Sequence, residues 1–191
     1  MSGRYLTRIY MIIPRLLTKY RKEVVPAMRA EFGHKNVMAV PKIIKVALNV
    51  GLSRAAKEPK FIERVENDLA KITGQKPTVR KARKSIAGFK TRQGMPVGMM
   101  VTLRGRRMYD FIDRLISIAL PRSRDFQGIN AKSFDQKGSL SIGIREHNIF
   151  PEVTYESLKD IFGLEVTVTT NAQAAKEGIE LLRLMGFPIK A

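Results

Sequence analysis

The stretch VGMMVTLRGRRMYDFIDRLISIA, residues 97–119, carries two apolar periodicities in succession. Alternation over residues 97–104 predicts a strand whose core-facing residues are Val97, Met99, Val101 and Leu103. Helical spacing then predicts an amphipathic helix, ended by Pro121, whose apolar residues are Met108, Phe111, Ile112, Leu115, Ile116 and Ala119. Because the strand and the helix each have one apolar face, this stretch predicts helices packed on a sheet.

Further strands are expected on both sides of this stretch. Residues 43–50 alternate, with Ile44, Val46, Leu48 and Val50 expected toward the core and Lys45, Ala47 and Asn49 on the other face. Residues 140–144 and 164–168 alternate in the same way. Residues 86–92 are expected to pair with residues 97–104 around Gly94-Met95-Pro96.

Three more helices complete the pattern. One is expected over residues 16–32 with a break or restart at Pro26, one over 61–73 stopped by Gly74, and one from about residue 171 to 185 closed by Gly186. The interleaved elements predict an α+β fold, a largely antiparallel sheet with helices on one face and a protruding basic loop. We expect an N-terminal extension over residues 1–14, facing a binding partner or solvent rather than acting as a targeting signal, and one domain over 15–191.

A long basic block separates Asp68 from Asp110. It contains no acid but eleven Lys and Arg. Solubility alone favours a mixture of both signs, so the block indicates a polyanionic partner. Within it, residues 74–92 combine seven cations with Gly, Pro and one aromatic residue, which suits a loop that follows a nucleic-acid backbone.

The charge of the whole chain agrees with this interpretation. The formal charge is +18 and the sequence pI is about 10.5. Residues 146–191 hold seven acids against four bases, so the excess of positive charge lies in residues 1–145. One side of the molecule is therefore expected to face RNA or DNA.

Enzyme chemistry finds little support in the sequence. There is no Cys, and the only two histidines, His34 and His147, are far apart, so no zinc set is evident. Neither a P-loop nor a dinucleotide fingerprint occurs. Asp110 and Asp113 are best interpreted as surface partners of the nearby arginines. The sequence predicts neither a catalytic site nor a cofactor, and no apolar run is long enough to span a membrane.

Eight short segments, in order, resemble the L5 family of large-subunit ribosomal proteins, bacterial type. They cover the chain from about Arg15 to Pro188, and are VPKIIKVALN (40–49), TGQKP (73–77), KSIAGFK (84–90), GMPVG (94–98), VTLRG (101–105), LPRSRDF (120–126), SFD (133–135) and FPE (150–152). Each is a weak pattern alone, but eight in the family's order are specific.

The resemblance implies binding of 5S rRNA and its placement in the central protuberance beside the large-subunit rRNA, with other ribosomal proteins there. It also implies contact with P-site tRNA through a basic loop and with a small-subunit head protein. It places 5S rRNA contacts on strand positions Lys45, Phe89 and Thr102. The full set expected to bind 5S rRNA is Lys42, Lys45, Asn49, Phe89, Lys90, Arg92, Thr102 and Arg104. The loop residues expected to contact tRNA are Lys76, Arg80, Lys81, Arg83, Lys84 and Ser85, in a segment, Gln75–Ser85, expected to be mobile.

Alternatives stay open at the level of single residues and of function. A run of charged residues is often just a solvent-exposed face. An aromatic residue such as Phe89 is more often part of a hydrophobic core than a surface on which RNA bases stack. Thr102 could occur in a strand simply because its side chain is β-branched. A free RNA-binding regulator or chaperone is the second functional hypothesis. A binder of anionic membranes is the third, and the sequence lacks a suitable amphipathic helix. A cytoplasmic ribosome is expected, with an organellar one as the alternative.

Overall fold

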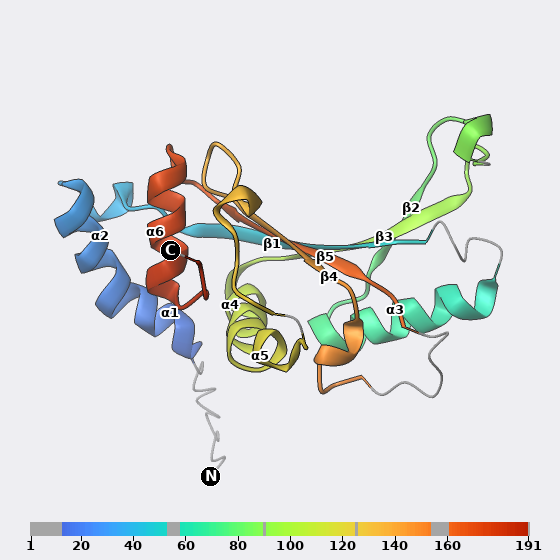
Figure 1. The fold of residues 1–191 in the computed structure, drawn as a ribbon, viewed down its shortest axis with the longest axis horizontal. Coiled ribbons are helices and arrows are strands. Elements are labelled where there is room, and N and C mark those ends of the chain that lie inside the picture. The colour runs from blue at the N-terminus through green and yellow to red at the C-terminus, as the bar shows by residue number, and fades with distance from the viewer. Residues whose placement is uncertain (1–12, 53–57, 90, 125, 154–160, 191) are drawn as a thin grey trace, which may run out of the picture.

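A five-stranded antiparallel sheet forms the centre of the computed structural model, which describes residues 13–52, 58–89, 91–124, 126–153 and 161–190 (Figure 1). The strand order is β2-β3-β1-β5-β4. The strands are β1 (Ile43–Gly51), β2 (Thr78–Lys81), β3 (Pro96–Leu103), β4 (Leu140–Ile144) and β5 (Leu164–Thr170). The predicted α+β class and the antiparallel sheet are confirmed.

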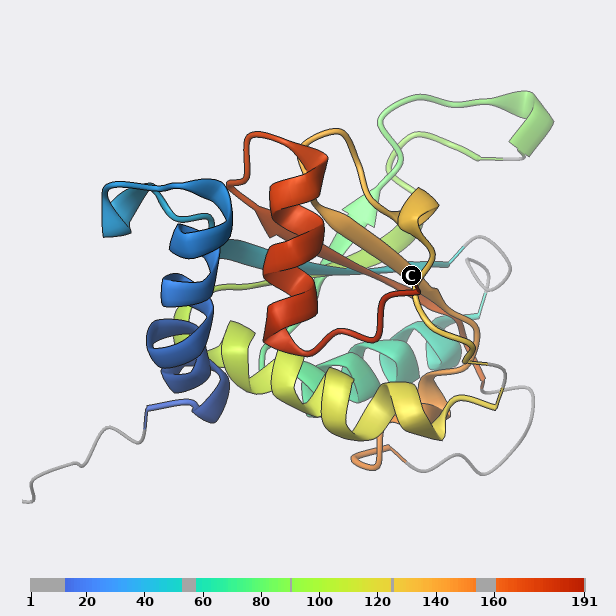
Figure 2. The ribbon, with the colours of Figure 1, turned by 60° about the vertical axis from the view of Figure 1, so that its left-hand side comes forward.

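The helices that cover the sheet include α3 (Pro59–Thr73) and α4 (Gly105–Arg114), which lie on the same side of it in Figure 1. Helix α3 contacts β3, and α4 contacts β1. Gly74 ends α3 in the left-handed conformation, as predicted, because a residue without a Cβ adopts φ +67° at little cost. Helix α6 (Ala175–Met185) lies beside α2 (Val25–Phe32) (Figure 2).

Two prolines sit inside longer helical segments. The chain runs from α1 (Arg15–Lys19) through the π-helical turn η1 (Tyr20–Val24) into α2, with Pro26 in the first turn, so the predicted restart is confirmed. Helix α4 likewise continues through η4 (Leu115–Ala119) into α5 (Leu120–Arg122), so the helical segment ends at Arg122, one residue beyond the predicted end at Pro121. A widened turn before each proline relieves the clash between its ring and the preceding turn.

The core lies between the helix-covered face of the sheet and the helices. Alternate residues of β1 and β3 are buried there against the apolar sides of α3 and α4. Val46, Leu48 and Val50 are buried as predicted, whereas Ile43 rather than Ile44 is the buried residue at the start of β1. The register of β1 against β5 shifts between Ile43 and Lys45, so the alternation starts one residue out of phase.

The predicted strand over residues 86–92 was wrong. The partner of β3 at the edge of the sheet is β2, inside the segment expected to be a mobile loop. The described residues of 86–92 contain only an isolated bridge between Ile86 and Thr91 and the 3-10 turn η3 (Ala87–Phe89). We call residues 78–89 and 91–96 the basic arm. It rises from the sheet on the side away from α3 and α4 (Figure 1).

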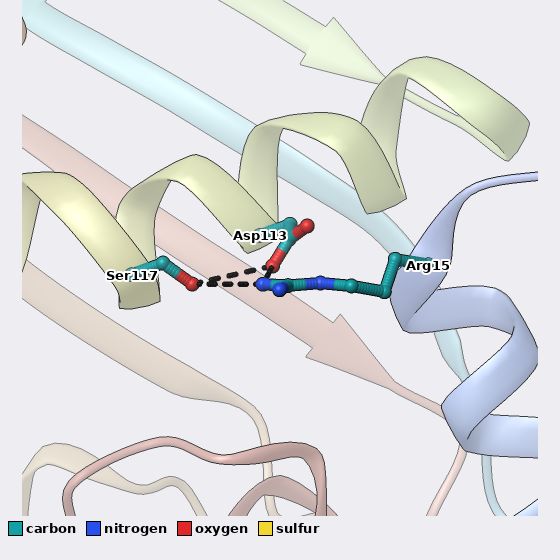
Figure 3. A network of polar contacts seen from close by, with 3 residues as sticks. All are labelled: Arg15, Asp113 and Ser117. Carbon is teal, nitrogen blue, oxygen red and sulfur yellow. Dashed lines mark hydrogen bonds and ion pairs between the residues drawn. The ribbon is translucent and has the colours of Figure 1, made fainter.

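Helix α1 is held against α4 by a polar contact. Arg15 Nη2 donates to Asp113 Oδ1 at 2.7 Å and to Ser117 Oγ at 3.2 Å, and Ser117 Oγ donates to the same carboxylate at 3.3 Å (Figure 3). Asp113 holds the pKa of the Arg15 guanidinium above its ordinary value by hydrogen bonding and charge. None of the helices within the described residues has the length and apolar character to cross a membrane.

Candidate nucleic-acid interface

The face of the sheet opposite the core, here called the open face, carries mostly polar and charged side chains. Its members from β1 and β3 are Lys45, Ala47, Asn49, Met100 and Thr102, those from β4 and β5 are Ser141, Gly143, Glu165, Thr167 and Thr169, and those from β2 are Thr78 and Arg80. All of these residues are partly or fully exposed, in contrast to the buried residues between them. The β-sheet period of two therefore separates a closed apolar face from an accessible polar one.

Cations line this face at two of its borders. Lys45 lies opposite Thr169 in the register of β1 and β5. Arg80, on edge strand β2, reaches across the neighbouring strand, where its Nη2 donates to Met100 Sδ at 3.4 Å. Arg80 was expected in the tRNA-contacting loop, but it lies on a strand and over the open face.

Lys42 and Arg104 flank the strands. The Lys42 backbone N–H donates to Asn171 Oδ1 at 2.6 Å, which fixes the entry into β1 while the residue stays exposed. Arg104, exposed at the N-cap of α4, directly follows the last residue of β3. Lys45, Asn49 and Thr102 lie on the open face, as strand alternation predicted, whereas Lys42 and Arg104 lie just outside the ends of β1 and β3.

The remaining predicted cations are distributed along the arm and beside α3. Lys76 Nζ lies 3.1 Å from Glu66 Oε1 of α3, so this cation is paired before the arm begins. Lys81 ends β2, and Arg83 and Lys84 are exposed beyond it. The arm therefore places these three cations, all predicted to contact tRNA, between the sheet and the arm tip.

Backbone hydrogen bonds continue along the arm beyond the strands. Ala82 N donates to Met95 O at 2.8 Å, and Ile86 and Thr91 exchange bonds of 3.1 and 3.2 Å. Ser85 Oγ accepts from Gln93 N at 3.0 Å. The predicted contact residue Ser85 therefore has a structural role in holding the two sides of the arm together.

Phe89 lies in η3 and is 78% exposed. The strand position expected for it was wrong, and so was the core alternative, because its ring is not buried. It lies beyond the Ile86–Thr91 bridge, at the far end of the arm from Thr102 and Lys45. Arg92 is exposed on the returning side of the arm, and Lys90 lies outside the described residues.

Three residues of the open face were missed in the sequence. Thr167, Thr169 and Ser141 occupy the polar positions of the alternating stretches 164–170 and 140–144. Their signal was present, since the same alternation that identifies the buried residues also identifies their neighbours. Alternation places these residues on the polar face of a strand, but it does not by itself mark them as RNA contacts.

The acids and histidines that resemble catalytic groups have structural partners. Asp110 Oδ2 lies 3.6 Å from Arg106 Nε, so the predicted pairing with a nearby arginine is confirmed for Asp110, whereas Asp113 pairs with Arg15 of the distant helix α1. His147 lies 3.8 Å from Asp68 and is stacked on Phe162. Within the described residues, no three His, Cys, Asp or Glu side chains are grouped as a metal site requires.

Comparison with known proteins identifies the family. A family model described as Ribosomal protein L5 matches residues 36–92, and a second model, described as the C-terminus of the same ribosomal family, matches residues 96–189. Large ribosomal subunit protein uL5 of Dictyoglomus turgidum is 54% identical over 175 residues, which are 92% of this chain and 98% of that protein.

Two further relatives with the same name agree. The protein of Synechocystis sp. is 52% identical over 177 residues, 93% of this chain and 98% of its own length. That of Rubrobacter xylanophilus is 51% identical over 176 residues, 92% of this chain and 98% of its own length. With identity of this level along nearly the whole chain and both family models matched, the chain belongs to the ribosomal protein L5 family.

Proposed function

We propose that the chain binds 5S rRNA through its open face and anchors that RNA in the central protuberance. As a member of the ribosomal protein L5 family, the chain is a structural, non-enzymatic constituent of the large ribosomal subunit. The observation that carries the proposal is the open face itself, a sheet surface with exposed polar side chains opposite a fully formed core.

The surface has the chemistry that an RNA backbone requires. Lys45 and Arg80 supply positive charge from two strands, Lys42 and Arg104 add it at the strand ends, and Asn49 and Thr102 supply neutral hydrogen-bonding groups. Cations neutralise phosphates and release counterions, while neutral groups hold the backbone in register. Phe89 and Arg92 extend the proposed 5S rRNA contact to the arm, and Lys90 belongs to the same proposed set, so the RNA has to reach from the sheet to the arm tip.

The distal arm is proposed to contact P-site tRNA. Lys81, Arg83 and Lys84 are exposed there, and Lys76 and Ser85 belong to the same proposed loop set. A contact made by cations through phosphates is independent of sequence, as a site used by every tRNA requires. A hairpin with continuous backbone bonds can carry these cations away from the body of the protein.

The remaining proposed partners follow from membership of the family. They are the large-subunit rRNA, other proteins of the central protuberance, and a small-subunit head protein across an intersubunit bridge. The ribosome is the proposed location, in a bacterial cytoplasm or in an organelle.

Sedimentation and filter binding together test the proposal. The chain is expected to travel with the large subunit at high salt and to bind 5S rRNA with an affinity that falls steeply as salt rises. Each phosphate contact contributes about 0.7–0.9 to the slope of log affinity against log salt. Lys45→Ala with Thr102→Val should weaken binding, whereas Lys60→Ala, on the exposed side of α3, should not. A chain that leaves the subunit at high salt and a slope near zero would contradict the proposal.

A further inference from the structure

A row of small side chains crosses the open face over four neighbouring strands. In the register of the sheet, Thr102 of β3 lies opposite Ala47 of β1, Ala47 opposite Thr167 of β5, and Thr167 opposite Ser141 of β4. Because adjacent strands are about 4.8 Å apart, the row from Thr102 to Ser141 spans about 14 Å. Three of its four members carry a hydroxyl group, and none carries a charge.

Two of these hydroxyls are already oriented by each other. Ser141 Oγ and Thr167 Oγ1 are 3.2 Å apart and share one hydrogen bond. A hydroxyl has one donor and two acceptor positions, so this pair still has one hydrogen to donate and lone pairs to accept. Ala47, between Thr102 and Thr167, has only a methyl side chain. The surface between the hydroxyls is therefore shallow, and an extended ligand can approach all three of them at once.

Charges on either side of the row define how an RNA strand can lie. The residues one step along β1 and β5 on one side are Lys45 and Thr169, and those on the other side are Asn49 and Glu165. Phosphates are attracted to Lys45 on one side of the row and to Arg80, which contacts Met100 Sδ on the other side, and they are repelled by the exposed Glu165 carboxylate. The row carries no charge and lies between the charged side chains, so it faces the ribose sugars of the RNA strand rather than its phosphates.

Ribose 2′-hydroxyls match the row in chemistry and shape. A phosphate oxygen only accepts hydrogen bonds, whereas a 2′-hydroxyl both donates and accepts, as the side chains of the row do. The minor groove of A-form RNA is wide and shallow and displays 2′-hydroxyls, so a low floor of small side chains can lie against it. We propose that Thr102, Thr167 and Ser141 bind ribose 2′-hydroxyls in a shallow minor groove of 5S rRNA. The inference rests on the proposed function and assigns β4 and β5 to the same interface.

The test replaces the two hydroxyls that no other argument has assigned to RNA. The double variant Thr167→Val with Ser141→Ala keeps side-chain volume nearly constant and removes both partners of their shared bond, so folding should be unaffected. The matched control is Thr18→Val with Ser123→Ala, on α1 and after α5. Each protein is titrated with 5S rRNA and with pools of 5S rRNA that carry sparse 2′-deoxy substitutions.

The double variant should bind unmodified 5S rRNA about tenfold more weakly, as expected for two neutral hydrogen bonds. Its salt dependence should equal that of the wild type, because neutral groups release no counterions. Positions where a 2′-deoxy sugar weakens wild-type binding should lose that effect in the variant. Unchanged affinity and an unchanged interference pattern would overturn this inference alone. A wild type that fails to bind 5S rRNA would overturn the proposed function as well.

Discussion

Removal of the Phe89 ring tests how the arm tip takes part in RNA binding. Phe89 is 78% exposed in η3, a turn with no buried residue, so Phe89→Ala removes no core contact. The free energy of unfolding should therefore change by no more than about 0.5 kcal/mol. Stacking of one base on an aromatic ring is worth roughly 1–3 kcal/mol, which predicts roughly a 5- to 150-fold loss of 5S rRNA affinity.

The assay is filter binding of labelled 5S rRNA at one fixed salt concentration, with circular dichroism as the folding control. Phe89→Leu keeps the apolar side chain but has no π face, so it should bind nearly as weakly as Phe89→Ala. Phe89→Trp should restore affinity. Ile86→Ala is the neighbouring control, because Ile86 is 50% exposed on the same arm and cannot stack. Wild-type affinity of a correctly folded Phe89→Ala variant would refute the stacking argument, and full affinity of Phe89→Leu would replace it with simple apolar contact.

Three further predictions concern the arm, the core and pH. Arg83→Ala with Lys84→Ala should weaken P-site tRNA retention on assembled ribosomes and leave 5S rRNA affinity within a fewfold, and the opposite pattern would contradict the assignment of these two cations to tRNA. Gly178→Ala should lower the free energy of unfolding by at least about 1–3 kcal/mol in urea titration, because a Cβ there would clash with the Gly138 backbone, and an unchanged unfolding midpoint would refute it. Burial lowers the pKa of His147 below 6.5 although Asp68 opposes the shift, so the unfolded chain binds the proton first. The contribution of His147 to the free energy of unfolding should therefore be constant well above pH 6.5 and should fall as the pH drops below 6.5. The variant His147→Gln should lack this part of the acid-induced loss of stability.

Strand alternation predicted the part of the site that belongs to the sheet. Burial of one face requires every second residue to be apolar, so Lys45 and Thr102 could be placed on the other face without a structure. The same rule failed at Ile44, where β1 changes its register against β5. That shift depends on pairing with β5, which is distant in the sequence, and local alternation does not contain this information.

The arm was mispredicted because its strand has almost no apolar pattern. In β2 only Val79 is partly buried, and it lies opposite Met99 of β3. Cations fill the other positions near the turn, so the residues that pair looked like a loop. Residues 86–92 have more apolar character, but they lie beyond the region where β3 offers a partner. Whether a segment of the arm pairs with β3 therefore depends on its distance from the sheet and not on its β-propensity.

The basic residues between Asp68 and Asp110 are continuous in sequence but lie in different parts of the structure. Lys76 pairs with Glu66 on the helix layer, Arg80 lies over the open face, and Arg83 is carried outward on the arm. A single count of cations therefore overstates the charge available to any one RNA. The arrangement predicts that 5S rRNA binding and tRNA contact have separate salt dependences, each smaller than the eleven cations together would give. The separation of Arg80 from Arg83 follows from the hairpin itself, because its two paired sides carry successive residues steadily away from the sheet.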